Sequence, residues 1–270
     1  MGSRGLKQID QSGGVASEHE DARKAAQQAT RDQVWAALRR VARPDSRFHW
    51  DFSSFIADFE GSERCASAIG QLPVYRDARM LFITPDNCLE GFREMALADG
   101  KAYVMTTYGI ARGFLYVDPD RIPAEDRRYA ATLDGVERYA RHVSLADLRS
   151  GPHIQLMVTG SSAVSISGLR FGKGHGYFDL EWAMLSELGV VDVGTPIIAV
   201  GHDCQVVDAE VTAFGHDTRV DLIVTPTRTI TPQRGDRPPG RVEWHRLSAG
   251  TFEAIPSLLE LRELLAQRSS

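Results

Sequence analysis

The stretch from residue 170 to residue 179 holds the side chains best placed to do chemistry. Its relevant members are Arg170, Gly172, Lys173, Gly174, His175, Gly176, Tyr177 and Asp179. Glycine lacks a Cβ, so its backbone N–H group can approach an anion closely. A helix that starts just after the loop adds unpaired N–H donors and the positive end of its dipole. With Arg170 and Lys173 supplying full positive charges, the stretch is expected to bind a polyphosphate.

The spacing differs from that of other nucleotide-binding glycine loops. It is neither GxxxxGK followed by Ser or Thr, nor GxGxxG followed by an acidic residue on the next strand. A run of glycines by itself is also typical of an ordinary turn, and on the glycines alone that alternative stays open. The neighbouring cations and the sequence Tyr177-Phe178-Asp179 favour a binding site.

Periodic apolar patterns indicate the elements that must position this loop. Strand patterns occupy residues 79–84, 101–106, 156–164, 196–200 and 222–225, and helical patterns occupy 21–41, 62–71, 88–98, 125–142, 179–188 and 251–268. Their alternation, with short connections, predicts an α/β fold with a mainly parallel sheet and helices on both faces. Ligands of such sheets bind beyond the carboxyl ends of the strands, where the glycine loop is expected to lie.

Length and composition restrict the function further. The chain has 270 residues, which suits one large α/β domain. Residues 1–22 are rich in Gly, Ser, Gln and charge and predict a disordered tail, which leaves residues 23–270 as the domain. A net charge of −5 argues against a nucleic-acid surface, so an anion would need a local cationic pocket. No apolar run approaches the ~18 residues of a membrane span. Three cysteines without CxxC spacing favour a reduced, cytoplasmic chain.

With these residues in view, the pattern R-x-G-x-G-x-G-Y-x-D resembles the signature of the 5-formyltetrahydrofolate cyclo-ligase, or methenyltetrahydrofolate synthetase, family. The amino-acid sequence from Val164 to Glu181 most resembles the homologous domain of methenyltetrahydrofolate synthetase domain-containing proteins. The resemblance continues through Thr195-Pro196, residues 202–207, His216-Asp217 and residues 220–228. It implies a single Rossmann-like three-layer domain of the type found in ribose-5-phosphate isomerase and the CoA transferases.

The resemblance also implies a reaction and its cofactors. The reaction is the cyclisation of 5-formyltetrahydrofolate to 5,10-methenyltetrahydrofolate, with ATP and Mg²⁺ as cofactors. ATP would be bound by Arg31, Arg170, Gly172, Lys173, Gly174, His175, Gly176, Tyr177 and Asp179. Of these, Arg170, Lys173 and Tyr177 would act at the reacting end. Asp179 and Asp217 would hold Mg²⁺, because hard carboxylate oxygens suit that ion. The partner would be a small molecule, either folate-like or another formylated or carboxylated compound.

Two positions depart from the family pattern. Asp86 stands where the resemblance places a glutamate that holds the pterin end of folate, and Gln27 stands where it places a lysine one turn before Arg31. The alternative for Asp86 is a cap on the following helix, and the alternative for Arg31 is a solvated helix face. Arg112, after the second predicted strand, is a candidate for binding a substrate carboxylate, with a surface turn as its alternative.

The departures leave two other functions open. One is an ATP-dependent ligase that performs the same chemistry on a different small molecule. The other is a protein without catalytic activity that binds a nucleotide or folate. The aromatic residues between positions 45 and 62 are interpreted as core filling rather than as part of a site.

Overall fold

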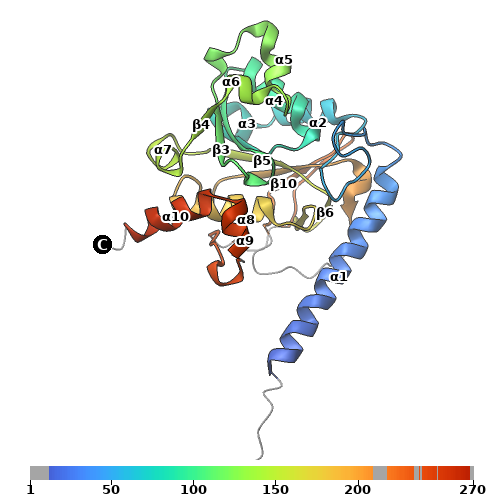
Figure 1. Ribbon diagram of the computed structural model, residues 1–270. Helices are drawn as coiled ribbons and strands as arrows, with labels where there is room; N and C mark the ends of the chain where they lie inside the picture. Colours follow the sequence, from blue (N-terminus) through green and yellow to red (C-terminus); the bar gives the residue numbers. More distant parts are fainter. Residues whose placement is uncertain (1–11, 209–217, 234–236, 238, 248, 268–270) are drawn as a thin grey trace, which may run out of the picture.

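The computed structural model describes residues 12–208, 218–233, 237, 239–247 and 249–267 (Figure 1). Its centre is an eight-stranded sheet in the order β11-β10-β8-β5-β1-β2-β3-β4. In chain order these strands are β1 (Met80–Ile83), β2 (Ala102–Thr106), β3 (Phe114–Val117), β4 (Arg141–Val143), β5 (Leu156–Gly160), β8 (Ile197–Val200), β10 (Leu222–Val224) and β11 (Thr229–Ile230). The five strands from β10 to β2 are parallel, and antiparallel strands complete both edges. The predicted α/β class with a mainly parallel sheet is therefore confirmed.

The central strands are apolar throughout because both faces of the sheet are covered. Successive side chains alternate between two cores: Leu81 and Ile83 of β1 pack into one, while Met80 and Phe82 pack into the other. The first core includes residues of α2 (Ser62–Gly70), α3 (Pro73–Asp77), α4 (Glu90–Ala98), α5 (Arg127–Ala130) and α6 (Val136–Tyr139). The second includes residues of α7 (Leu145–Ser150), α8 (Tyr177–Leu188) and α10 (Ser257–Ala266), near α9 (Ala249–Ala254). Figure 1 shows these two helical layers on either side of the sheet.

A second, three-stranded sheet supports the glycine loop. Its order is β7-β6-β9, formed by β6 (Ala163–Ser165), β7 (Arg170–Phe171) and β9 (Val206–Val207). The run expected as one strand over residues 156–164 is thus divided into β5 and β6. The division follows Gly160, whose carbonyl accepts a hydrogen bond from the Arg170 side chain. β7 leads directly into the glycine loop, and α8 begins where the loop ends.

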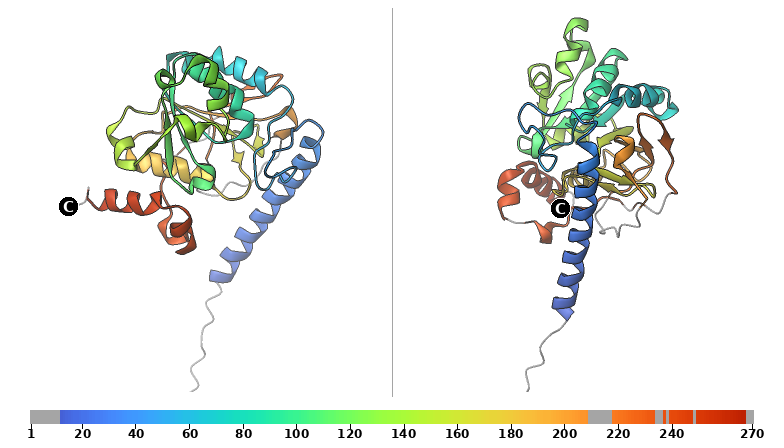
Figure 2. Two further views of the ribbon diagram at one scale, coloured as in Figure 1. Left: turned by 45° about the horizontal axis from the view of Figure 1, so that its top comes forward. Right: turned by 90° about the vertical axis from the view of Figure 1, so that its right-hand side faces the viewer.

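The N-terminal helix α1 (Ser12–Leu38) is longer than predicted. Part of it projects away from the body of the protein (Figures 1 and 2). Residues 12–22, expected to belong to a disordered tail, are helical, and residues 1–11 lie outside the described residues. Once the packed end at Val34 and Leu38 is ordered, each further helical residue adds a hydrogen bond without a new nucleation step. Among the described residues, no helix is both long and apolar enough to cross a membrane.

The segment expected as one polar helix over residues 125–142 is organised differently. It forms two short helices, α5 and α6, followed by the edge strand β4, which pairs antiparallel with β3. Gly135 interrupts the helical pattern: a Cβ there would lie 1.9 Å from the carbonyl oxygen of Tyr129. Strand pairing with β3 then outweighs the local helical preference of the last residues.

Candidate functional site

The candidate site lies at the carboxyl ends of β1, β2 and β5. Thr84 follows β1, Thr106 ends β2, and Gly160 ends β5. The glycine loop lies between two pockets, because the same loop residues line both of them. The inner pocket is lined by Arg47, Phe48, Phe55, Ile56, Thr84, Pro85, Asp86, Asn87, Thr106, Tyr108, Gly109, Leu133, Phe178 and Glu181, together with the loop. The outer pocket is lined by Lys24, Ala25, Gln27, Gln28, Arg31, Ser53, Ser54 and Asp179, together with the loop.

Two glycines give the loop its shape. Gly174 has φ 104° and Gly176 has φ 68°, both in the region that side chains disfavour. Gly176 is also the residue before α8, and no side chain caps that helix end. An added Cβ at Gly176 would meet no atom within 4 Å, so the backbone conformation rather than crowding requires glycine there. The N–H groups of the first turn of α8 are thus left for a ligand.

Arg170 is held rigidly beneath the loop. It is buried, its Nε donates to the carbonyl oxygen of Gly160 at 2.9 Å, and its guanidinium lies 4.7 Å from the centre of the Phe178 ring. The contact joins β7 to the end of β5. Its terminal nitrogens lie beside Gly172, where a Cβ would approach one of them to 3.2 Å. Arg170 therefore places a fixed positive charge under the loop.

Lys173 lies on the wall that the two pockets share. Its Nζ is 5.0 Å from the centre of the Tyr108 ring and 5.8 Å from that of Tyr177. Burial and the neighbouring Arg170 lower the pKa of the lysine, while Asp86 and Glu181 oppose that shift. The two ring faces favour the cation. The amine is thus desolvated but still surrounded by groups that stabilise its charge.

His175 extends the same cationic cluster. Its ring stacks on that of Tyr177, with the centres 5.5 Å apart and the planes 15° from parallel. Burial lowers the pKa of His175, and the positive charges of Lys173 and Arg31 lower it further. An anion bound beside these residues would remove part of that repulsion.

α1 closes the outer pocket through Arg31. The Arg31 Nε donates to the carbonyl oxygen of Gly172 at 2.9 Å, and one terminal nitrogen donates to the side chain of Gln28 at 3.0 Å. The other terminal nitrogen reaches the Gln27 side chain at 3.4 Å. Arg31 is buried against the loop, so the alternative of a solvated helix face is wrong for this residue.

Asp179 is the one residue of the expected metal pair that the structure describes. It lies in the first turn of α8, lines the outer pocket, and its Oδ1 accepts the backbone N–H of Thr218 at 2.8 Å. The Oγ1 of Thr218 is buried and has no hydrogen-bond partner among the described residues. Asp217, the other expected ligand, lies outside the described residues.

Asp86 belongs to the inner pocket and does not cap a helix. Its Oδ2 accepts the Oγ1–H of Thr84 at 2.5 Å and the backbone N–H of Gly160 at 2.8 Å, and its side chain makes no hydrogen bond to the following helix. The helix-cap alternative is therefore wrong. The carboxylate is held between the ends of β1 and β5, where it can accept hydrogen bonds from a ligand.

The contact between Asp86 and Gly160 predicts the effect of one added methyl group. A Cβ at position 160 would lie 2.9 Å from each of three side-chain atoms, on Ile56, Asp86 and Cys88. We expect Gly160→Ala to destabilise the fold by about 1–3 kcal/mol, because the packed neighbours must move. Gly91→Ala in α4 is the control, since nothing lies within 4 Å of its Cβ, and it should be neutral or stabilising. Urea unfolding gives the free energy of unfolding of both variants. Equal values for the two would contradict the expected crowding at position 160.

Glu181 is a buried carboxyl group that the sequence analysis left without a role. It lines the inner pocket, and its Oε1 accepts the Oγ1–H of Thr106 at 2.5 Å. Burial raises the pKa of Glu181 to about 8, and the Thr106 hydrogen bond offsets only part of the shift. A signal was present: Glu181 occurs at helical spacing with Phe178, Trp182 and Leu185, which are buried, so it lies on the core face of α8.

The raised pKa of Glu181 predicts a pH-dependent stability. Between its ordinary value of 4.5 and about 8, the folded protein keeps this proton and the unfolded chain releases it. Stability therefore falls as pH rises, by about 1.4 kcal/mol per pH unit. We expect the wild type to lose about 2 kcal/mol relative to Glu181→Gln between pH 6 and pH 7.5. Urea unfolding with a chelator present measures both proteins, and parallel pH profiles would contradict the shift.

The structure brings aromatic side chains to the site that were expected only to fill the core. Phe52 and Phe59 do so, but Phe48 and Phe55 also line the inner pocket. The Phe48 ring stacks on that of Tyr108 at 5.3 Å, and the Tyr108 hydroxyl donates to the carbonyl oxygen of Ser54 at 2.7 Å. These contacts bring the segment between residues 45 and 62 against the turn after β2.

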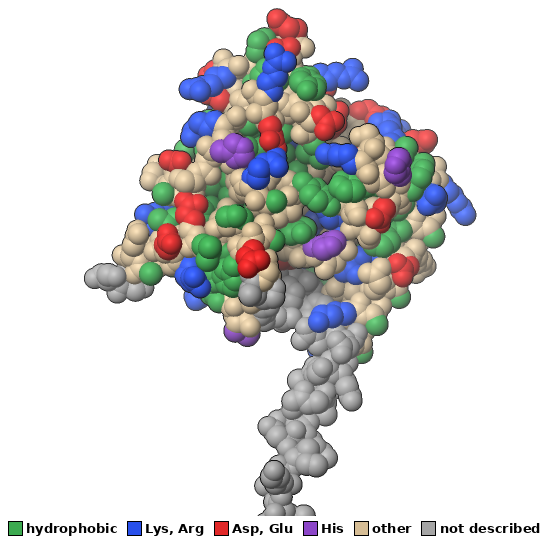
Figure 3. Space-filling view, viewed as in Figure 1, with side chains coloured by type: hydrophobic (Ala, Val, Ile, Leu, Met, Phe, Trp, Pro, Cys, Tyr) green, Lys and Arg blue, Asp and Glu red, His purple; other side chains and the backbone are tan. Residues whose placement is uncertain are grey.

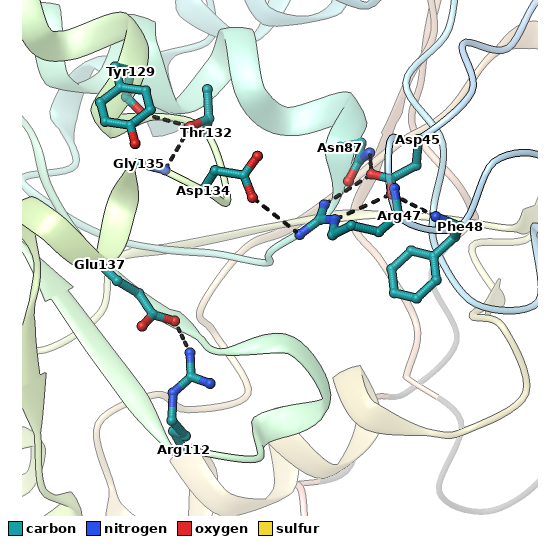
Figure 4. Close-up of polar contacts among 10 residues, drawn as sticks. All are labelled: Asp45, Arg47, Phe48, Asn87, Arg112, Tyr129, Thr132, Asp134, Gly135 and Glu137. Atoms are coloured by element: carbon teal, nitrogen blue, oxygen red, sulfur yellow. Dashed lines mark hydrogen bonds and ion pairs between the residues drawn. The ribbon is translucent and has the colours of Figure 1, made fainter.

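Arg112 is not brought into either pocket. Its exposed side chain forms an ion pair with Glu137 of α6, whereas Arg47 lines the inner pocket (Figure 4). Arg112 is therefore a surface residue in a turn, as the alternative in the sequence analysis had it, and does not line the pocket that would bind a substrate. On the face shown in Figure 3, positive and negative side chains are interspersed.

Comparison with known proteins supports the resemblance seen in the sequence. The chain is similar to the methenyltetrahydrofolate synthase domain-containing proteins of Bos taurus and Homo sapiens, each 35% identical over 238 residues. Each alignment covers 87% of this chain and 61% of the relative, so the chain spans less than two thirds of those proteins. Among solved structures, it is similar to 5,10-methenyltetrahydrofolate synthetase of Aquifex aeolicus, at 15% identity and a TM-score of 0.48, covering 82% of this chain and 99% of that one.

The sequence profile of the 5-formyltetrahydrofolate cyclo-ligase family matches residues 23–226. That range includes every residue that lines the inner and outer pockets. The resemblance is therefore confirmed over the part of the chain that builds the site, and the chain belongs to the 5-formyltetrahydrofolate cyclo-ligase family, a family of ligases.

Proposed function

We propose that this protein is an ATP- and Mg²⁺-dependent ligase that cyclises 5-formyltetrahydrofolate to 5,10-methenyltetrahydrofolate. One observation carries the proposal: the glycine loop lines both pockets at once. A nucleotide in the outer pocket and a folate in the inner pocket would meet at Lys173 and Arg170. Bringing two reactants together in this way supplies much of the rate enhancement of a group-transfer enzyme.

The outer pocket has the features that a triphosphate requires. Positive charge comes from Arg170, Lys173 and Arg31, and the left-handed glycines leave the N–H groups of the α8 terminus uncapped. Asp179, which lines this pocket, offers a hard carboxylate oxygen that suits Mg²⁺. The residues present therefore fit both cofactors.

When bound, ATP supplies a γ-phosphoryl group that turns the formyl oxygen of the substrate into a leaving group. The protein itself would position the two reactants and neutralise the negative charge of the phosphoryl group. Lys173 and Arg170 would offset the charge that develops on the transferred group, because both are fixed beside the loop before any ligand arrives. Tyr177 and Tyr108 flank the amine and would exclude water from it. The N10 amine of the folate, which lies outside the pterin ring, would then attack the activated formyl carbon and lose its proton as phosphate leaves. ADP, phosphate and 5,10-methenyltetrahydrofolate would be the products.

In the inner pocket, Asp86 would accept hydrogen bonds from the N–H groups at the pterin end of the folate. Its Oδ2 is already occupied by Thr84 and Gly160, which leaves Oδ1 for the ligand. Aspartate reaches about one C–C bond less far than the glutamate of the family pattern, and a displacement near 1 Å can cost on the order of 10²-fold in rate. We therefore propose slower turnover of this substrate than in a typical cyclo-ligase.

The test is the rise in absorbance of methenyltetrahydrofolate on adding ATP and Mg²⁺ to the protein and 5-formyltetrahydrofolate. Product that forms only with both cofactors supports the proposal, and a faster Asp86→Glu variant supports the role of Asp86. Phosphate release with another formylated substrate, and none with folate, would replace folate as the substrate. ATP binding with no phosphate release from any of them would favour a protein that binds nucleotide without catalysis.

A further inference from the structure

Arg47, at the mouth of the inner pocket, is held in place along one edge. Its Nε and one terminal nitrogen contact the two oxygens of Asp45 at 3.3 and 3.0 Å. Asp45 is buried, and it also accepts the Asn87 side-chain N–H at 2.7 Å and the backbone N–H groups of Arg47 and Phe48 at 2.7 and 3.0 Å. Figure 4 shows this arrangement. A guanidinium anchored along one edge presents its remaining donors in a fixed orientation.

The anchor of Arg47 is itself strongly charged. Burial alone would raise the pKa of Asp45, but the hydrogen bonds from Arg47, Asn87 and the two backbone N–H groups hold it well below its usual range. Asp45 therefore stays ionised, and the guanidinium stays where it is placed.

The other edge of Arg47 is only loosely occupied. Its second terminal nitrogen lies 3.9 Å from the carboxylate of Asp134, whose side chain is 73% exposed, while that of Arg47 is 40% exposed. An ion pair this long and this exposed is weak, because water screens it. A carboxylate on a ligand that enters the pocket can therefore replace Asp134 at this edge.

The inner pocket is lined by aromatic side chains as well as by charged ones. Arg47 lies 5.7 Å from the centre of the Phe48 ring, and Phe48 stacks on Tyr108 at 5.3 Å. The same pocket is also lined by the carboxyl groups of Asp86 and Glu181 and by the loop cations Arg170 and Lys173. The inner pocket thus combines buried carboxyl groups, loop cations and an aromatic wall with Arg47, whose side chain is 40% exposed.

We propose that Arg47 binds a carboxylate of the substrate at the end remote from the reacting group. The substrate then has three parts: an N–H-bearing end inside, a planar middle segment stacked along Phe48 and Tyr108, and an anionic end at Arg47. This inference rests on the proposed function, since it specifies the substrate of the same pocket. It assigns to Arg47 the role that the sequence analysis gave to Arg112, whose side chain is paired with Glu137 instead.

The test compares two probes that contain only the middle and anionic parts. These are N-benzoylglutamate and its diamide, in which both carboxylates become neutral amides, and their binding to the full chain is measured by NMR titration without ATP. We expect the wild type to bind the acid about tenfold more tightly, as one charge-assisted, two-point contact would produce. Arg47→Gln should remove that preference, and Arg47→Lys should retain part of it. Arg112→Gln is the matched control and should keep the preference unchanged.

Equal binding of acid and diamide to the wild type would overturn the proposal. So would an Arg47→Gln variant that weakens both probes alike, because the side chain would then only shape the loop. Stronger binding of the acid to Asp134→Asn would support the displacement of Asp134. The probes carry no formyl group, so the result is independent of turnover. A chain that prefers the acid through Arg47 but forms no methenyl product with ATP keeps this binding site and loses the proposed reaction.

Discussion

Lys173→Met is expected to lower kcat/KM for ATP-dependent turnover by about 10³-fold, with little change in the fold. Removing one preorganised electrostatic donor from an active site costs on the order of 10²–10³-fold, and Lys173 carries a full charge in a desolvated position. It also lies on the glycine loop, and Lys173 itself lines both the inner and the outer pocket. Its loss should therefore affect both reactants.

The measurements are phosphate release and methenyltetrahydrofolate absorbance, with thermal unfolding as a check on the fold. Lys173→Arg should not restore the rate, because the amine occupies a slot between the rings of Tyr108 and Tyr177 and the guanidinium is larger and planar. The melting temperature should stay near that of the wild type, since methionine replaces a partly buried charge with an apolar chain of similar length. Turnover within tenfold of the wild type would exclude Lys173 from the reaction.

Arg93→Met is expected to destabilise the protein by about 3–5 kcal/mol, the range observed when a buried charged partner is removed. Arg93 of α4 is fully buried, and burial lowers its pKa. Its Nε donates to the carbonyl oxygen of Ala131 at 2.7 Å, and one terminal nitrogen donates to those of Thr84 and Asp86 at 3.0 and 3.1 Å. The variant would remove this donor from three buried carbonyl groups. That of Asp86 would keep the backbone N–H of Leu89, whereas those of Thr84 and Ala131 would lose the Arg93 hydrogen bond, and an unsatisfied buried group is costly.

Urea unfolding measures the loss, and Arg128→Met on the exposed surface is the control, expected within about 0.5 kcal/mol of the wild type. Arg93→Lys should be intermediate, because one ammonium group cannot reach three carbonyls in the same geometry. The backbone of Asp86 should loosen as well, so turnover should fall together with stability. An Arg93→Met protein within 1 kcal/mol of the wild type would show that these hydrogen bonds are replaced by others.

The glycine loop and its surroundings could be predicted because their signals are local. The loop lies within ten residues of sequence, and the strands and helices next to it follow periods of two and of 3.6 that depend only on neighbouring residues. The α/β class, the position of the loop between a strand and a helix, and the involvement of Arg170 and Lys173 follow from such patterns. Arg31 was assigned only through the family resemblance, and the structure places it in the wall of the outer pocket.

The features that the sequence analysis did not predict share one physical cause: they depend on contacts between residues far apart in the chain. The edge strand β4 was taken for helix because its pairing with β3 is not visible in its own residues. Arg112 and Arg47 are both arginines in loops, and nothing local distinguishes the one that pairs with Glu137 from the one that lines the pocket. Arg93 was missed because helix propensity does not indicate which carbonyl groups a buried arginine will reach.

Local residue patterns were enough to indicate an anion-binding glycine loop, two of its cations, the five parallel strands of the central sheet and the family. The tertiary structure decided which of these groups meet. Glu181 meets Thr106 across 75 residues of chain, and Arg31 meets Gly172 across 141. Contacts over such separations form only when parallel strands bring their carboxyl ends to one edge of the sheet and helices pack on both faces. A site built from those ends therefore depends on the packing of the whole domain.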